Sequence, residues 1–145
     1  MTEISKTAVV PYTPSEMYAL VNDIESYSVF LTWCTAAKVL NKKEESLIAI
    51  LSLAMGKIKQ SFTTENTMLE GSRIDMQLIE GPFKHLSGYW KFNPGDEQSC
   101  HIQLHMNYEF KNKIIKYALG KVFYIVMDTL VESFVQRAQQ IYGNR

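Results

Sequence analysis

Apolar and polar residues alternate strictly between Cys100 and Phe110. The even positions are apolar and the odd positions are polar: Cys100, Ile102, Leu104, Met106, Tyr108 and Phe110 against His101, Gln103, His105, Asn107 and Glu109. A period of two is typical of a β-strand with one buried face and one solvated face. The segment is therefore predicted to be a strand in a sheet that is covered on one side.

After Lys113 the hydrophobic period changes to that of a helix. About thirty helical residues at about 1.5 Å each would span roughly 45 Å, enough to lie across a whole sheet. Gly120 costs about 1 kcal/mol relative to Ala inside such a helix. We interpret it as a bend that lets Ile114–Leu119 turn away from the main helix. The apolar stripe consists of Ile115, Leu119, Phe123, Val126, Leu130, Phe134, Ala138 and Ile141.

The earlier residues predict one helical segment and an antiparallel sheet. A first edge strand ends at Pro11, and Thr13-Pro14-Ser15-Glu16 predicts a capping box at a helix start. A second short helix or turn is expected at about 25–31. Turn-forming connections then separate six strands, predicted at 35–43, 46–55, 57–68, 72–80, 84–93 and 98–111. We predict a single α+β domain, 1–145, with a curved antiparallel sheet of six to seven strands wrapped on the C-terminal helix.

Composition fits a globular domain with one core, because 46% of the 145 residues are hydrophobic and 21% are charged. Fifteen basic and fifteen acidic residues cancel, so binding to nucleic acid or to a membrane would need a local patch. The start of the chain lacks a targeting pattern, and Val122–Met127 is far shorter than the roughly 20 residues that cross a bilayer. We expect a cytoplasmic protein in which Cys34 and Cys100 are buried hydrophobes.

The sequence offers little support for catalysis. It contains no nucleophile elbow, no phosphate-binding glycine loop and no zinc-binding helix motif. His101 and His105 share a predicted outer face, but roughly 13 Å along the strand separates them, too far for one metal ion. Glu80 lies beside a predicted loop, but no second acidic or basic side chain is predicted beside it to act with it in catalysis. We therefore predict no catalytic residue, no metal site and no tightly bound cofactor.

Both predicted core faces are rich in aromatic and methionine side chains, such as Met76, Trp90, Met106 and Phe123. Periodicity alone favours a filled core. Because the sheet face and the helix face are both rich in aromatic and methionine side chains, the two faces would also suit an adaptable cavity. The pattern does not distinguish the two.

A basic cluster precedes the apolar half of the long helix. Positive charge at a helix N-terminus opposes the helix dipole by a few tenths of a kcal/mol per residue, so helix stability does not explain the cluster. Lysines interleaved with apolar residues suit RNA phosphate or a membrane surface, whereas the alternative is a solvated helix end. The cluster consists of Lys111, Lys113, Lys116 and Lys121.

One motif, Glu80-Gly81-Pro82-Phe83-Lys84-His85-Leu86-Ser87-Gly88-Tyr89-Trp90-Lys91-Phe92, has the pattern of a family signature. Further matches are Val10-Pro11-Tyr12, Met17–Asp23, Phe62-Thr63-Thr64, and Phe110 to Phe123 around Asn112-Lys113 and Gly120. Over nearly its whole length the chain resembles the START-like coenzyme-Q-binding family, also called polyketide-cyclase-like. The resemblance implies a helix-grip fold of the START-like and Bet v 1-like type, in agreement with the predicted order of elements.

The resemblance also implies two functions. Some family members bind ubiquinone and support respiration as lipid chaperones, whereas a bacterial branch of ribosome-association toxins binds the large ribosomal subunit and blocks subunit joining. In one segment the chain departs from the family, because Ser28 and Thr32 replace two prolines. Loss of two fixed φ angles should loosen this loop and alter ligand access if the loop borders a pocket.

Our leading hypothesis is a non-enzymatic protein that holds an isoprenoid quinone or similar lipid, with transient contact with the inner membrane. Its predicted lining is Phe62, Met76, Phe83, Trp90, Phe92, Leu104, Tyr108, Phe123 and Val126, with Phe30 and Trp33 near the entrance. The alternative is binding to the large ribosomal subunit through Lys111, Lys113, Lys116 and Lys121. A polyketide cyclase is the third hypothesis, and no DNA binding is expected.

Overall fold

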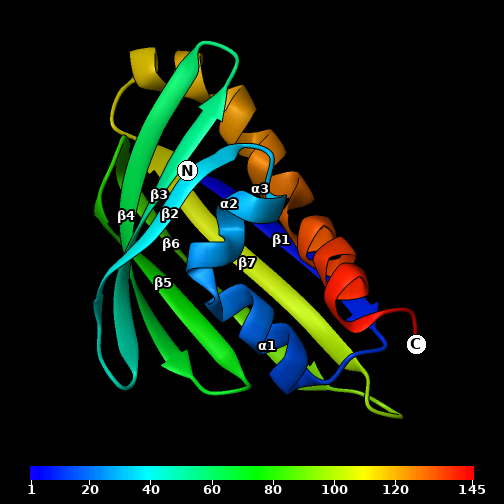
Figure 1. Cartoon of the computed structure of the whole chain (residues 1–145). Helices are drawn as coiled ribbons and strands as arrows, with labels where there is room; N and C mark the ends of the chain where they lie inside the picture. The colour runs from blue at the N-terminus through cyan, green and yellow to red at the C-terminus, as the bar shows by residue number, and fades with distance from the viewer.

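Seven antiparallel strands form one curved sheet (Figure 1). The computed structural model describes every residue from Met1 to Arg145. The order across the sheet is β1-β7-β6-β5-β4-β3-β2, so β2 to β7 form a meander and β1 lies at the edge beside β7. The strands are β1 (Thr2–Val10), β2 (Cys34–Lys42), β3 (Ser46–Met55), β4 (Ile58–Leu69), β5 (Arg73–Glu80), β6 (Phe83–Pro94) and β7 (Cys100–Phe110). The predicted meander and the edge position of β1 are confirmed.

The helices cover one face of this sheet (Figure 1). The helical elements are α1 (Pro14–Asn22), the 3₁₀ turn η1 (Ile24–Ser26), α2 (Tyr27–Phe30) and α3 (Lys113–Tyr142). The predicted capping box is confirmed, because the Glu16 amide donates to Thr13 Oγ1 (3.2 Å) and the Thr13 amide donates to Glu16 Oε1 (2.9 Å). α3 is one continuous helix that includes Gly120. This is the predicted α+β helix-grip arrangement.

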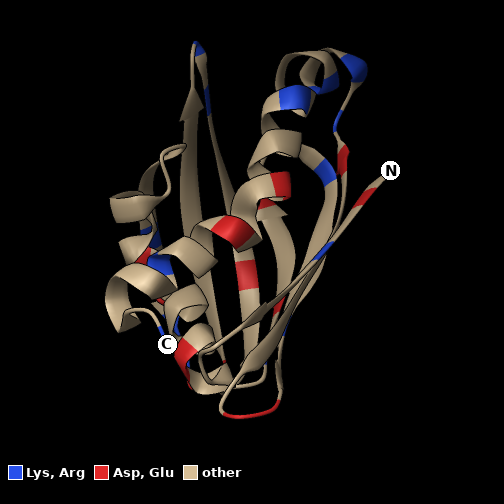
Figure 2. Cartoon of the chain, turned by 90° about the vertical axis from the view of Figure 1, so that its right-hand side faces the viewer, with Lys and Arg blue, Asp and Glu red and all other residues tan.

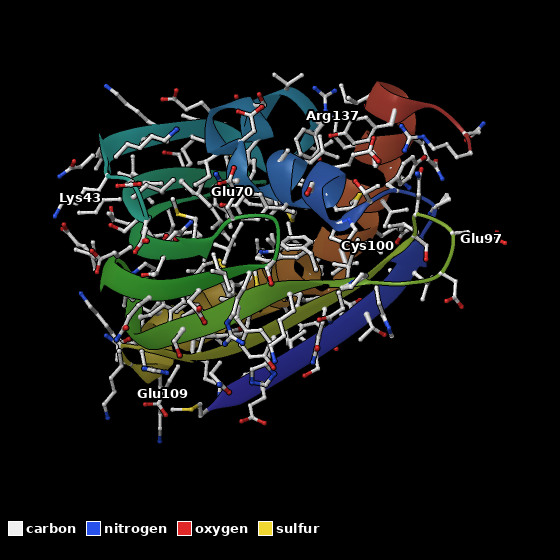
Figure 3. All side chains as sticks on the ribbon, turned by 90° about the horizontal axis from the view of Figure 1, so that it is seen from below. Lys43, Glu70, Glu97, Cys100, Glu109 and Arg137 are labelled. Carbon is white, nitrogen blue, oxygen red and sulfur yellow. The ribbon has the colours of Figure 1, made fainter.

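Side chains between the sheet and the helices form one apolar core (Figure 3). Phe123 of α3 is 1% exposed, and its ring makes edge contacts with Phe62 of β4, Phe83 of β6 and Tyr108 of β7. Each such aromatic pair contributes about 0.5–1.5 kcal/mol beyond the burial of its area. These contacts therefore fasten the first half of α3 to three strands.

Gly88 of the central motif lies where two strands approach closely. A Cβ atom at this position would be 2.2 Å from the carbonyl oxygen of His105 and 2.3 Å from the Sδ atom of Met106. Both neighbours belong to β7, which pairs Met106 with Gly88. The motif therefore needs glycine here because the His105 carbonyl and the Met106 side chain occupy the space of a Cβ atom.

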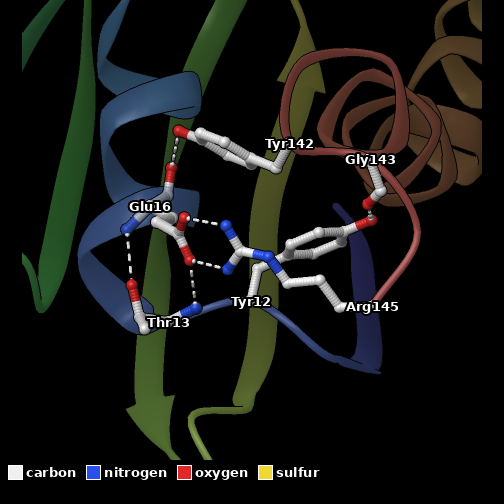
Figure 4. A network of polar contacts seen from close by, with 6 residues as sticks. All are labelled: Tyr12, Thr13, Glu16, Tyr142, Gly143 and Arg145. Atoms are coloured by element: carbon white, nitrogen blue, oxygen red, sulfur yellow. Dashed lines mark hydrogen bonds and ion pairs between the residues drawn. The ribbon is translucent and has the colours of Figure 1, made fainter.

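The C-terminus is fastened to the start of α1 (Figure 4). Arg145 makes a bidentate ion pair with the Glu16 carboxylate at 2.6 and 2.8 Å. The Tyr142 hydroxyl donates to the Glu16 carbonyl (2.9 Å), and the Tyr12 hydroxyl donates to the Gly143 carbonyl (2.6 Å). Hydrogen bonds from Arg145 and from the Thr13 backbone lower the pKa of Glu16 from 4.5 to about 2. Glu16 thus both caps α1 and holds the end of α3.

Replacing Gly88 with Ala should destabilise the fold by about 1–3 kcal/mol, because the new methyl group overpacks the contact with β7. Gly120→Ala is the matched control. A Cβ atom there meets nothing closer than 3.8 Å, so this change should stabilise the protein by about 0.5–1 kcal/mol. Urea unfolding of the two variants measures both effects. Equal stability of Gly88→Ala and the unchanged protein would contradict the packing argument.

Replacing Arg145 with Gln should lower the melting temperature modestly at neutral pH, because the ion pair is partly exposed. The lowered pKa of Glu16 means that its stabilising contribution is complete above about pH 4.5 and is lost as the pH falls towards 2. Melting curves of the two proteins should therefore converge over that range. Arg137→Gln is the control, since Arg137 bonds Gln140 and no carboxylate. If the difference in melting temperature between the unchanged protein and Arg145→Gln stayed constant from pH 7 down to about 2, the Glu16 ion pair could not be its source.

Candidate functional site

A small cavity lies between the sheet and the second part of α3. Its volume is about 60 Å³, and fourteen of the sixteen residues that line it are hydrophobic. The lining comes from α3 (Phe123, Met127, Leu130, Phe134), from the η1–β2 segment (Ile24, Tyr27, Trp33) and from the sheet (Ala49, Leu51, Phe62, Thr64, Asn66, Met76, Leu86, Trp90, Met106). The interior is thus mostly filled, with one enclosed apolar space.

Five of the predicted lining residues border this cavity: Trp33, Phe62, Met76, Trp90 and Phe123. All the α3 residues on the lining follow Val122 in the chain. This placement agrees with the interpretation that the later half of α3 covers the interior. Whether these residues contact a ligand stays a prediction.

The other six predicted residues, Phe30, Phe83, Phe92, Leu104, Tyr108 and Val126, lie outside the lining. Phe83 and Tyr108 pack with Phe123 beyond the cavity, and the Phe92 ring packs against Tyr18 of α1. Leu104 and Val126 are fully buried in the core. Their inward direction was predicted correctly, but they fill the core rather than border the space. Phe30 lies in an outer groove, described below.

Eleven lining residues are absent from the predicted lining, although Met106, Leu130 and Phe134 were placed on the apolar faces: Ile24, Tyr27, Ala49, Leu51, Thr64, Asn66, Leu86, Met106, Met127, Leu130 and Phe134. Thr64 and Asn66 are the polar members of this set. They follow Phe62 at intervals of two on β4, so they face the same side of the sheet. The period-two rule could have found them, but polar residues were not sought in an apolar interior.

The polar groups in the cavity differ in how far protein partners satisfy them. Thr64 and Asn66 are 8% and 7% exposed, and the Thr64 hydroxyl donates to Asn66 Oδ1 at 2.8 Å. The Tyr27 hydroxyl donates to the Val21 carbonyl, and burial raises the pKa of Tyr27 far above its usual value. Tyr27 is therefore committed to the backbone, whereas the Asn66 amide nitrogen has no protein acceptor.

The segment with the two replaced prolines borders the cavity. Trp33 lines the cavity and also an outer groove of about 220 Å³, together with Phe30 and Thr32. The far side of that groove is formed by α3, including Ser133 and Arg137. Trp33 thus borders both the cavity and the outer groove. That ligand enters at this position stays a prediction.

The lysine cluster forms a second surface feature, at the N-terminal end of α3 (Figure 2). All four lysines are exposed, and none lies within ion-pair distance of a carboxylate. Lys111, Lys113 and Lys116 line a surface groove of about 390 Å³, and Lys121 lies outside it. Two large side chains beside them, Ile114 and Tyr117, are 82% and 93% exposed. The helix end therefore presents unpaired positive charge together with apolar surface.

None of the cavity-lining residues is an Asp, Glu, His, Lys or Arg. His101 and His105 lie on the outer face of β7, as predicted, and Ser5 Oγ is 2.9 Å from His105 Nδ1. Cys34 and Cys100 are buried free thiols, and burial raises the pKa of Cys100 to about 11. No group of three or more His, Cys, Asp or Glu is placed to hold a metal ion, and none of the helices is long and apolar enough to cross a membrane.

Comparisons of the chain with known proteins identify related families and structures. Residues 10–135 match the family described as polyketide cyclase/dehydrase and lipid transport. The ribosome association toxin RatA of Escherichia coli K12 is 40% identical over 145 residues, which cover all of this chain and 92% of RatA. The mitochondrial coenzyme Q-binding protein COQ10 homolog B of Xenopus laevis is 26% identical, covering 99% of this chain and 60% of that protein.

A solved START superfamily protein from Mycobacterium smegmatis has a TM-score of 0.80 and 18% identity, covering 96% of this chain and 98% of that one. The family match spans most of the chain, and the similarity to RatA extends over its full length. These findings confirm the resemblance that the central motif indicated. The chain therefore has a START-like fold and belongs to the polyketide cyclase/dehydrase and lipid transport family, on its bacterial RatA branch.

Proposed function

We propose that this protein binds an isoprenoid quinone or a similar hydrophobic lipid in the space between the sheet and α3. The observation that carries the proposal is the enclosed cavity with its almost wholly apolar lining. The family description includes lipid transport, and a relative along nearly the whole chain is named a coenzyme Q-binding protein. In this role the protein is a cytoplasmic lipid chaperone for respiration, which takes its ligand by transient contact with the inner membrane.

The cavity must expand to accept such a ligand. At about 30 Å³ per water molecule, 60 Å³ holds about two waters, whereas ligand pockets are usually about 300–1,000 Å³. Three lining residues, Met76, Met106 and Met127, have flexible unbranched side chains that can change rotamer at low cost. Trp33, on the loop without the family prolines, lies between the cavity and the surface groove. We infer that ligand enters past Trp33 and displaces the methionines.

A ligand that binds only the folded state should raise the melting temperature. Decylubiquinone at about 100 times its Kd should stabilise the protein by about 2.7 kcal/mol, or roughly 5–10 °C for a domain of this size. Organic extraction of protein purified from its own host, followed by mass spectrometry, should find a quinone.

Ala49→Leu should suppress this rise, because the added carbons occupy the cavity that Ala49 lines. Ala36→Leu, at an exposed position of β2, is the matched control and should keep the full effect. Absence of both the quinone in the extract and the melting shift in the unchanged protein would defeat the proposal.

A second candidate function is association with the large ribosomal subunit through the N-terminal end of α3. The specific observation is the set of unpaired lysines beside exposed Ile114 and Tyr117. Lysines can bind RNA phosphates, and an exposed tyrosine ring can stack on an unpaired base. Relatives that are 38–40% identical are named ribosome association toxins. A toxin of this kind would block subunit joining, and its surface is separate from the cavity.

Overexpression should then increase free subunits in a sucrose gradient, and a Lys113/Lys116/Lys121→Glu variant should not. The triple change reverses the local charge that attracts phosphate. Lys38/Lys42/Lys43→Glu changes the net charge by the same amount, but on β2 and the loop after it. This control variant should behave as the unchanged protein. An unchanged gradient with the unaltered protein would exclude this function, and equal loss in both triple variants would exclude this surface.

The cyclase hypothesis has no comparable support. Cyclisation of a polyketide needs a group that can transfer protons inside the cavity. The lining has no residue that titrates near neutral pH, since Tyr27 is held protonated by burial. We therefore propose a non-enzymatic role.

A further inference from the structure

One polar pair lies in the otherwise apolar lining. Thr64 and Asn66 point inward from β4, where Thr64 is paired with Ala49 and Asn66 with Leu47 of β3. Both side chains are more than nine-tenths buried. Buried polar side chains normally have their strong hydrogen-bonding groups paired with protein or with water, so a free group that is accessible from the cavity needs an explanation.

The free group is the amide nitrogen of Asn66. Its only side-chain hydrogen bond is the one that Oδ1 accepts from the Thr64 hydroxyl, so both N–H donors lack a protein acceptor. On the neighbouring strands Asn66 faces Leu47 and Met76, whose side chains have no strong acceptor. The Tyr27 hydroxyl, which is also on the lining, donates to the Val21 carbonyl, and its only hydrogen bond is that one, not one with Asn66. A donor is thus held in an apolar cavity without use in the fold.

We propose that Asn66, held by Thr64, is the recognition site for an oxygen atom of the bound lipid. This inference rests on the lipid-binding function proposed above. The Asn66 amide would donate to a ring carbonyl oxygen of a quinone. If the amide turns over, its nitrogen donates to Thr64 Oγ1 and its oxygen accepts from a ring hydroxyl. The same pair therefore accepts the oxidised quinone and the reduced quinol.

The position of the pair also orients the ligand. Trp33 lies beside the far end of β3, where the Ala54 amide donates to the Trp33 carbonyl. Asn66 is paired with Leu47, seven residues earlier on β3, a backbone distance of roughly 23 Å at about 3.3 Å per residue. The polar ring would thus lie at the Asn66 end of the site, and its apolar tail would extend towards Trp33.

The test compares two probes, decylubiquinone and decylbenzene, which share a tail but differ in the oxygens of the ring. The variant is Thr64→Val/Asn66→Leu, in which both side chains keep nearly their shape and lose their polar groups. Because Trp33 and Trp90 line the cavity, quenching of their fluorescence gives Kd for decylubiquinone, and competition against it gives Kd for decylbenzene. We expect the variant to bind decylubiquinone about three- to tenfold more weakly, the loss of one hydrogen bond, and decylbenzene at least as tightly.

The melting temperature of the ligand-free variant is a second readout. Replacing both polar partners by apolar groups of the same shape should leave it equal or higher, so weaker quinone binding cannot be ascribed to a damaged fold. If the double variant does not fold, Thr64→Val alone should reduce the preference for decylubiquinone in the same direction. An unchanged preference in the folded variants overturns the inference and leaves lipid binding intact. Failure of the unaltered protein to bind either probe overturns both.

Discussion

The structure depends on one constraint, which is that the apolar face of the curved sheet must be covered by α3. Phe123 shows how this is achieved, since its ring contacts side chains from three strands and is almost fully buried. The sheet is long and strongly curved, so one helix cannot fill every point beneath it. The remaining gap is the cavity, and η1, α2 and Trp33 close it from the side.

Much of the fold could be predicted because each element carries its own signal. The alternation along 100–110 identifies one covered face, and Thr13 with Glu16 identifies the start of α1. The cavity could not be located in this way, because periodicity gives the direction of a side chain but not the volume left between facing side chains. Leu104 and Phe123 both point inward, yet only Phe123 borders the space. That difference depends on the curvature of the sheet.

The same limit explains why Gly88 and Asn66 were not assigned roles from the sequence. The need for glycine at Gly88 arises from the His105 carbonyl and from Met106, which is eighteen residues away in the chain and directly opposite in the sheet. Asn66 follows the inward period of β4, but its free donor is visible only when every neighbour is known. Both roles depend on pairs of residues that the fold brings together, so neither has a local pattern.

A fold optimised only for stability would not keep the Thr64–Asn66 pair beside an unfilled space. Apolar residues at both positions and a larger side chain at Ala49 would remove an unpaired donor and fill the gap. Likewise, lysines without carboxylate partners at the N-terminus of α3 oppose the helix dipole. Departures from the most stable arrangement are expected at functional sites. They occur here at two separate places, on β4 opposite the middle of α3 and at the N-terminal end of α3, so the proposed lipid site and the proposed partner surface do not overlap.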